Sequence, residues 1–285
     1  MDHPQESPRV LSTVTGYGGI ELGLAASVGP LRIIAYVERE AYACQNLVAK
    51  VEAGRLPCAP IWTDLRTFIA GPLLGRVDVL TGGYPCQPFS VAGKRLGAAD
   101  PRHLWPEYVR IIGECRPRWC FFENVRGHVS KGLREVRYDL ERLGYRVEAG
   151  IFSAEEVGAP HRRERVYLLA ADTHRELLRF QLRGSGGTYR DGPAVPGDDG
   201  KAQPMADANR AGLEGHRDVY RGLPVDARSG GPPDLGGWDV EPGLGRLAHG
   251  VAHRVDRLRL AGNGVVPQCA EHAFRTLYRQ HLTNT

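Results

Sequence analysis

The stretch VLSTVTGYGG, residues 10 to 19, decides how the rest of the chain is interpreted. Its first six residues are mostly apolar or β-branched and predict a strand. The glycines at positions 16, 18 and 19 predict a tight turn, since glycine tolerates backbone angles that other residues avoid. An amphipathic stretch over residues 20–27 predicts a helix directly after that turn. A strand, a glycine turn and a helix in this order are typical of an α/β domain.

The same alternation continues along the first half of the chain. Apolar runs predict further strands at residues 32–37, 61–63, 77–80, 119–122 and 165–170, and helical patterns cover residues 41–52 and 270–281. Strands that alternate with helices predict a mainly parallel, doubly wound sheet. Ligands bind such sheets at the carboxyl ends of the strands. Those ends carry Gly16, Glu38, Asp64, Cys86 and Glu123, and this coincidence predicts a functional site.

Composition limits the possible classes of protein. The chain has 285 residues and a net charge of +4, which permits a polyanionic partner without requiring one. It has no apolar run long enough to cross a bilayer and no signal-peptide pattern at its start, so we expect a cytoplasmic protein. None of the six cysteines is spaced C-x-x-C, which argues against a structural zinc site. Most of these thiols are expected to be small buried side chains.

The sequence changes character after residue 171. Residues 184–243 contain 14 glycines and 7 prolines, a share expected of loop-rich sequence. Periodic sequence resumes near Leu244, so we predict a small insertion within the α/β domain after residue 171.

The glycine turn and two carboxylates suggest a cofactor. The third glycine of the dinucleotide fingerprint G-x-G-x-x-G would fall on Glu21, so the turn does not match that motif. Glu38 ends the second strand, where a carboxylate can accept hydrogen bonds from ribose hydroxyls. Asp64 ends the third strand and could accept from an adenine amino group. An adenosine without a pyrophosphate fits this set better than NAD, and S-adenosylmethionine (SAM) is the favoured candidate; a plain structural turn is the alternative.

Cys86, in GGYPCQPFS, could be a buried core thiol, half of a disulfide, a metal ligand or a nucleophile. Only a thiolate reacts, and an ordinary thiol needs a nearby cation to ionise at neutral pH. Arginines 162, 163 and 165 of the HRRER stretch are candidate cations. A solvated loop for this stretch, a helix cap or surface carboxylate for Glu123, and a core thiol for Cys86 are the structural alternatives.

Seven stretches together resemble the cytosine-C5 DNA methyltransferases, especially the phage and prophage-like bacterial branch. They are TGYGG, VERE, the strand that ends at Asp64, GGYPCQPFSVAGKRLG, FFENVRG, GAPHRRERVYLLA and AGNGVVPQ, in the order of the family. The resemblance implies a Rossmann-like SAM-dependent methyltransferase sheet with a small, loop-rich target recognition insertion. It places the catalytic SAM-binding domain at residues 1–171 and 256–285 and the target recognition domain at residues 172–255. It also implies methylation of cytosine C5 at a specific short sequence in duplex DNA, on a base flipped out of the helix. A monomer in the cytoplasm of a bacterium or phage-infected cell is expected.

The resemblance also implies roles for individual residues. Cys86 would add to cytosine C6, Glu123 would hold or protonate N3, and Asn124 would position both; Arg165 would contact the cytosine carbonyl and Arg163 a phosphate. The implied cofactor-binding residues are Val14, Gly16, Tyr17, Gly18, Gly19, Glu38, Arg39, Asp64, Leu65, Pro85, Leu104, Asn263 and Gly264. The expected DNA-binding residues are Gln87, Ser90, Lys94, Arg95, Arg179, Arg183, Arg254 and Arg257. No metal is expected.

Three positions depart from the family pattern. Val14 stands where a phenylalanine normally packs against adenine, His161 replaces a glutamine, and Gly264 replaces a common serine.

The same chemistry on tRNA is one alternative function, although the long insertion favours DNA. A DNA- or SAM-binding protein without catalysis is another, and Cys86, Glu123 and Arg165 argue against it. A nicotinamide dehydrogenase would leave Pro85-Cys86-Gln87 without a role.

Overall fold

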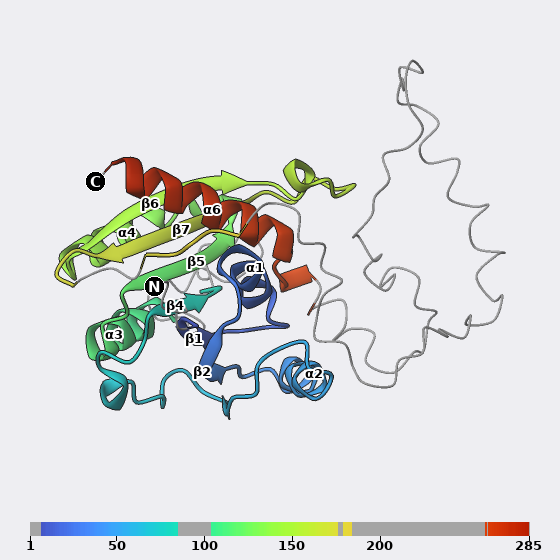
Figure 1. Cartoon of the computed structure of the whole chain (residues 1–285). Coiled ribbons are helices and arrows are strands. Elements are labelled where there is room, and N and C mark those ends of the chain that lie inside the picture. The colour runs from blue at the N-terminus through green and yellow to red at the C-terminus, as the bar shows by residue number, and fades with distance from the viewer. Residues whose placement is uncertain (1–6, 85–103, 176–178, 184–259, 261, 285) are drawn as a thin grey trace, which may run out of the picture.

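The structure is a computed structural model that describes residues 7–84, 104–175, 179–183, 260 and 262–284. Cys86 and the other predicted site residues at 85, 87, 90, 94, 95, 254 and 257 lie outside the described residues. The described part contains one mixed sheet with helices on both faces (Figure 1). This architecture confirms the predicted doubly wound α/β fold.

Seven strands form the sheet in the order β3-β2-β1-β4-β5-β7-β6. Strands β1 to β5 pair in parallel, whereas β7 runs antiparallel to both of its neighbours. Strand β6 was not predicted from the sequence. The bounds are β1 Arg9–Thr13, β2 Arg32–Val37, β3 Ile61–Trp62, β4 Val79–Gly82, β5 Trp119–Val125, β6 Tyr145–Phe152 and β7 Arg165–Asp172.

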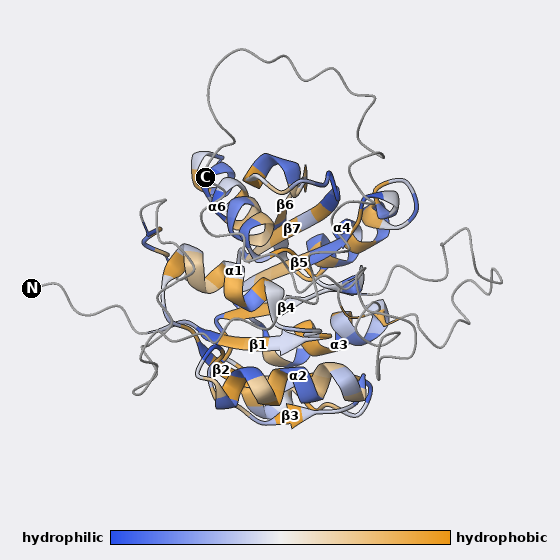
Figure 2. Cartoon of the chain, turned by 90° about the vertical axis from the view of Figure 1, so that its right-hand side faces the viewer, coloured by the Kyte–Doolittle hydropathy of each residue, from blue (hydrophilic) through white to orange (hydrophobic). Residues whose placement is uncertain are grey.

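Helices cover the sheet in two layers, one on each face (Figures 1 and 2). One apolar cluster joins the sheet to α1, α2 and α6, and a second cluster joins it to α3 and α4. The sequence predicted α1, α2 and α6, but not α3 or α4. The helix bounds are α1 Gly19–Val28, α2 Ala41–Glu52, α3 Trp105–Cys115, α4 Leu133–Arg142 and α6 Pro267–Thr283, with short 3-10 turns η1 Gly71–Leu73, η3 Arg126–His128 and η4 Glu155–Val157.

Two glycines let the first helix approach the last one closely. A Cβ on Gly19 would lie 2.2 Å from the carbonyl oxygen of Val265, and one on Gly23 would lie 2.4 Å from that of Pro267. The fully buried Leu24 and Phe274 belong to the cluster that fills this side of the core. Truncating a buried side chain of this size to alanine costs about 2 to 5 kcal/mol, so this contact is a large part of the stability of the domain.

The topology separates two edges of the sheet. Strands β1, β2, β4 and β5 end at the carboxyl edge, where the antiparallel β7 begins at Arg165. At the amino edge, β7 ends at Asp172 and α1 ends near Gly29. Among the described residues, no helix is long and apolar enough to span a membrane.

Residues that follow β7 remain attached to the core. Phe180 is 8% exposed and its ring packs against Trp119, Phe274 and Tyr278. The amide of Arg183 donates to the carbonyl oxygen of Ser27 at 2.9 Å. The domain boundary at residue 171 stays a prediction, and the described residues up to 183 pack with the core rather than away from it.

Candidate active site

The glycine turn after β1 has the backbone that its sequence predicts. Gly16 and Gly18 have φ angles of 59° and 83°, in the left-handed region that favours glycine. Val14 also has a positive φ, 47°, which is strained for a β-branched residue. Among the described residues, no atom lies within 4 Å of the position that a Cβ on Gly16 would occupy. The turn therefore leaves open space beside its backbone at the carboxyl edge.

Glu38 is held rigidly next to this turn. Its Oε2 accepts the amide of Gly16 at 2.7 Å, and its Oε1 accepts the amide of Glu40 at 2.8 Å. The residue is only 5% exposed, so the carboxylate is fixed in a partly desolvated position. Two bound amides leave further lone pairs on the carboxylate, which can accept two hydroxyl donors.

A second carboxyl group, that of Glu21, links β1 to β4 next to the turn. Glu21 is 2% exposed, and its Oε1 accepts the hydroxyls of Ser12 at 2.7 Å and Thr81 at 2.6 Å. Burial raises the pKa of Glu21 above its usual value. In the sequence, Glu21 only excludes a dinucleotide motif, and this supporting role was not predicted.

Tyr17 connects the turn to the stretch at residues 262–266. Its hydroxyl donates to the carbonyl oxygen of Val265, and a Cβ on Gly264 would lie 1.8 Å from its Cε1. The ammonium group of Lys50 lies 4.5 Å from the centre of the tyrosine ring and donates to the Tyr17 carbonyl oxygen at 2.6 Å. Because the tyrosine ring fills this space, glycine is required at 264 where the family commonly has serine.

Asp64 and its neighbours lie beyond β3, next to the end of β2. The Asp64 carboxylate accepts the amide of Arg66 at 3.0 Å, and Leu65 is 4% exposed. Arg39, directly after Glu38, is exposed. Leu104 is the N-cap residue directly before α3 and packs partly against the second apolar cluster. The predicted cofactor-binding residues that the structure describes therefore lie in four places. They follow β1, β2 and β3, they lie in the 262–264 stretch, or, for Leu104, they lie directly before α3.

Glu123 and Arg165 form an ion pair where β5 and β7 adjoin. The Nε of Arg165 is 3.0 Å from Oε1 of Glu123, whose side chain is 9% exposed. Burial raises the pKa of Glu123 to about 7, although the positive charges of Arg165 and Arg163 oppose this shift. A carboxyl group with this pKa can donate or accept a proton at neutral pH.

Asn124 joins the end of β5 to the chain just before the predicted nucleophile. Its Nδ2 donates to the carbonyl oxygen of Tyr84 at 2.8 Å, and its Oδ1 accepts the amide of Val125 at 2.8 Å. The Tyr84 ring is anchored among Trp105, Tyr108, Phe122 and His128. The last described residue before Pro85 and Cys86 is therefore tied to the same strand as Glu123.

Arg163 has a contact that the sequence did not predict. Its Nη2 donates to the carbonyl oxygens of Gly262 at 2.8 Å and Gly264 at 2.5 Å. Arg163 therefore links the start of β7 to the stretch that contains Asn263. Its predicted contact with a DNA phosphate stays a prediction.

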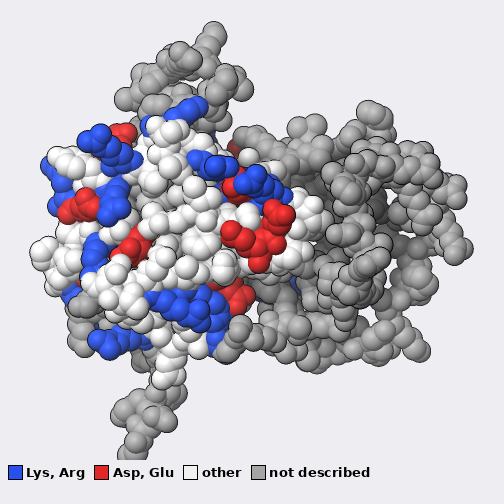
Figure 3. All heavy atoms as spheres, turned by 90° about the horizontal axis from the view of Figure 1, so that it is seen from above, with Lys and Arg blue, Asp and Glu red and all other residues white. Residues whose placement is uncertain are grey.

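Arg183 lies at the opposite edge of the sheet from Glu123 and Arg165. Its guanidinium lies next to Gly29, with Nε 3.1 Å from the position of a Cβ there, at the amino edge. Arg179 precedes Phe180 on the same packed segment. Figure 3, which looks onto the molecule from above the view of Figure 1, shows Lys and Arg interspersed with Asp and Glu on the face that it presents. The predicted DNA contacts of Arg179 and Arg183 stay predictions.

Cysteines and metal ligands add no further reactive centre within the described ranges. Cys115, Cys120 and Cys269 are buried, as predicted, whereas Cys44 is half-buried and Cys58 is exposed. No cluster of three or more His, Cys, Asp or Glu side chains suited to a metal ion occurs in the part of the chain that the structure describes.

Residues 9–185 match the family model of the C-5 cytosine-specific DNA methylases. The Type II methyltransferase M.PspPI of Psychrobacter sp. (strain TA137) is 35% identical over 176 residues, which are 60% of this chain and 41% of the relative. The Type II methyltransferase M.NlaX of Neisseria lactamica is 33% identical over 178 residues, or 60% of this chain and 55% of the relative.

Solved structures with similar coordinates include the S. pombe Dnmt2 methyltransferase, at 26% identity and a TM-score of 0.48, covering 60% of this chain and 53% of that one. The chain spans about half the length of the curated relatives it matches. The family match covers well over half of the chain and includes the glycine turn, Glu38, Glu123 and Arg165. This chain belongs to the family of C-5 cytosine-specific DNA methylases.

Proposed function

We propose that the chain is a SAM-dependent DNA methyltransferase that methylates cytosine C5 in duplex DNA at a specific short sequence. The observation that carries the proposal is the buried pair of Glu123 and Arg165, next to the Asn124 amide that holds Tyr84. This arrangement places an acid of pKa about 7 two strands from the glycine turn, at the same edge of the sheet. Proton transfer to a base and binding of an adenosine cofactor both need groups at this edge.

The residues at the glycine turn fit SAM. The open space beside Gly16 admits a ligand close to the backbone, and the fixed carboxylate of Glu38 has lone pairs for ribose hydroxyls. We assign the adenine amino group to Asp64, with Leu65 and Arg39 beside it. When bound, SAM supplies an electrophilic methyl group on a sulfonium.

The protein groups would make cytosine C5 nucleophilic. Cys86, which lies outside the described residues, would add as a thiolate to C6 of a flipped-out base, breaking the C5–C6 double bond. Glu123 would donate a proton to N3 at the same time, so that negative charge does not accumulate in the ring. After C5 has gained the methyl group, a solvent water would take the C5 proton, which re-forms the double bond and expels the Cys86 thiolate, and N3 would return its proton to Glu123. Arg165 would hold both the Glu123 carboxyl and the cytosine carbonyl.

Methylation mapping tests this proposal directly. The protein is incubated with radiolabelled SAM and duplex DNA, and the modified positions are mapped by bisulfite sequencing. We expect label on cytosine C5 within one short sequence. Label on adenine, or on tRNA alone, would overturn the proposal in favour of another substrate.

Trapping of a covalent adduct tests the nucleophile. DNA that contains 5-fluorocytosine cannot lose its C5 substituent as a proton, so the enzyme should remain attached to the base. Cys86→Ala should abolish the adduct, whereas Cys58→Ala, a change at an exposed cysteine, should leave its yield unchanged. An adduct with Cys86→Ala would show that another residue is the nucleophile.

A further inference from the structure

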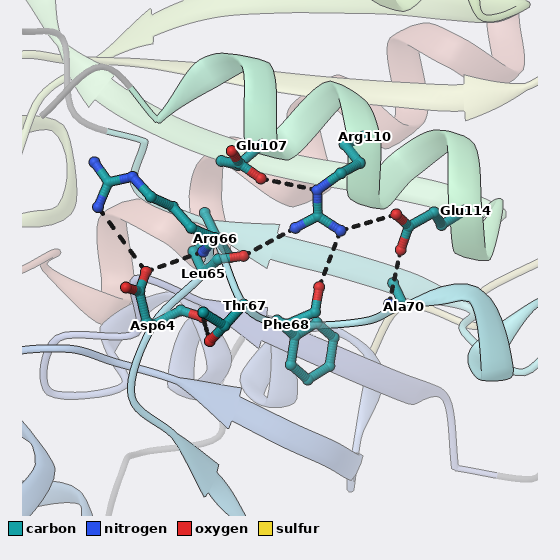
Figure 4. A network of polar contacts seen from close by, with 9 residues as sticks. All are labelled: Asp64, Leu65, Arg66, Thr67, Phe68, Ala70, Glu107, Arg110 and Glu114. Atoms are coloured by element: carbon teal, nitrogen blue, oxygen red, sulfur yellow. Dashed lines mark hydrogen bonds and ion pairs between the residues drawn. The ribbon is translucent and has the colours of Figure 1, made fainter. Parts of the chain in front are cut away.

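A network of charged groups on α3 faces the segment that follows Asp64 (Figure 4). Arg110 lies between two carboxylates of its own helix, with Nε 2.8 Å from Glu107 Oε2 and Nη1 2.8 Å from Glu114 Oε1. These are the i,i+3 and i,i+4 neighbours that share one face of a helix. The two carboxylates therefore fix the guanidinium plane of Arg110 before it makes any contact outside the helix.

The same guanidinium donates to two backbone carbonyl oxygens of that segment. Nη2 lies 3.0 Å from the carbonyl oxygen of Leu65, and Nη1 lies 3.0 Å from that of Phe68. The second oxygen of Glu114 accepts the amide of Ala70 at 2.8 Å. One side-chain pair on α3 therefore holds three peptide groups within six residues after Asp64, as Figure 4 shows.

These contacts set the direction of the chain directly after Asp64. The backbone there forms a tight turn, with the amides of Thr67 and Phe68 donating to the carbonyl oxygens of Asp64 and Leu65 at 3.2 and 3.4 Å. The Leu65 peptide therefore receives hydrogen bonds from both the turn and Arg110. Because the Asp64 carboxylate is 38% exposed and accepts the amide of Arg66, its position depends on this turn rather than on burial.

We infer that Arg110 is a positioning residue for the adenosine end of the cofactor, acting through the peptide groups of Leu65 and Phe68. The inference rests on the proposed function, because it assigns Asp64 and Leu65 to adenine. Arginine suits this role because its planar fork reaches two carboxylates and two carbonyls in fixed directions. Lysine keeps the charge but has three donors on a point-like ammonium group for these four acceptors.

The test compares cofactor binding with DNA binding. Arg110→Ala should raise both the Kd for SAM, measured by calorimetry without DNA, and the KM for SAM by about tenfold, since lost hydrogen bonds to a charged group cost about that factor. The KM for DNA and kcat at saturating SAM should change less than about twofold by the same reasoning. Arg110→Lys should fall between the wild type and the alanine variant.

Arg137→Ala is the matched control. Arg137 forms an i,i+4 ion pair with Glu141 at 2.7 Å on α4. Helix α4 contacts β6, which lies at the opposite end of the strand order from β3. Arg137→Ala should therefore leave the Kd for SAM unchanged.

Equal SAM affinity of the wild type and both Arg110 variants would overturn the inference. A fall in melting temperature with parallel changes in both KM values would do the same, since that pattern indicates a purely structural role. If Arg110→Ala does not fold, an unchanged Kd in Arg110→Lys still counts against the inference. A wild-type protein that binds no SAM would instead refute the proposed function and, with it, this assignment.

Discussion

Glu123 should give the reaction a pH dependence that the sequence alone could not predict. Its pKa of about 7 lies above the ordinary carboxyl value because the side chain is buried. A proton donor with this pKa loses its proton as the pH rises above 7, so kcat/KM should fall on the alkaline side. Glu123→Gln should lower kcat by about 100-fold or more and should remove this alkaline decrease. Steady-state rates of methyl transfer from pH 6 to 9 measure both effects.

The stability of the protein gives an independent check on Glu123. A folded-state pKa of about 7 against an ordinary value of 4.5 means that the folded protein binds the proton more tightly. This group therefore stabilises the fold below pH 4.5, and the contribution is lost as the pH rises to 7. The free energy of unfolding of the wild type should fall relative to Glu123→Gln over this range. A constant difference between the two would show that the pKa is not raised.

Tyr17 and Gly264 should behave as a coupled pair. A serine at 264 would place its Cβ inside the ring of Tyr17, so Gly264→Ser alone should lower stability and SAM affinity. Adding Tyr17→Ala makes room, so the double variant should lose less than the sum of the two single losses. We expect a coupling free energy of about 1 kcal/mol or more from a four-variant urea unfolding series. Additive effects would mean that the 262–264 stretch shifts without contacting Tyr17.

The short turn η3 and the start of α4 enclose His128, whose ring packs edge-on against that of Tyr84. Neither ring nitrogen of His128 has a hydrogen-bond partner within the described part of the chain, and burial lowers the pKa of the ring to about 4. A folded pKa below the ordinary 6.5 means that the full contribution to stability is present above pH 6.5 and is lost as the pH falls toward 4. This turn should therefore make the protein sensitive to acid.

His128→Leu should remove that sensitivity. Replacing two unpaired buried nitrogens by an apolar side chain should stabilise the fold by about 1 kcal/mol at neutral pH. The gain over the wild type should be larger at pH 5 than at pH 7.5 in urea unfolding. A less stable variant at both pH values would indicate that the ring nitrogens have partners after all, such as ordered water.

The elements that carry the ligand-binding edge could be predicted because each has a strong local signal. Apolar runs identified β1, β2, β4, β5 and β7, and the bounds of α2 were predicted to the residue. Helix α4 has apolar residues at helical spacing, Leu133, Val136 and Leu140, and β6 begins with alternating apolar and polar residues, so both carried local signals that the sequence-based prediction did not use. The antiparallel direction of β7 depends on pairing distant segments, which local sequence does not specify.

For the site, residue types were predictable and contacts were not. Cys86, Glu123 and Arg165 carry chemistry that their sequence context suggests. The roles of Arg110, Lys50 and Arg163 depend on which backbone carbonyls lie opposite them. Such contacts join segments up to about a hundred residues apart, so only the folded chain brings them together.

The distribution of charge around the molecule bears on how DNA lies against it. Replacing both Arg179 and Arg183 with alanine should weaken binding to all duplexes alike, if both contact phosphates as the sequence predicts. The slope of log K against log salt concentration should then fall by about two. Arg137→Ala is a control for the loss of a surface cation. An unchanged slope would mean that these arginines do not contact DNA, and the place of Arg183 beside Gly29 would explain why.

The close contact of α1 with α6 also determines when the protein can complete its fold during synthesis. The glycine face of α1 receives its partner only after roughly 240 further residues, which take about 10 to 50 s at typical rates of translation. Until then, Leu24, Trp119 and Phe121 have no α6 side chains to cover them. The nascent chain therefore presents a large apolar surface, and chaperones that bind such surfaces should bind it until α6 has left the ribosome.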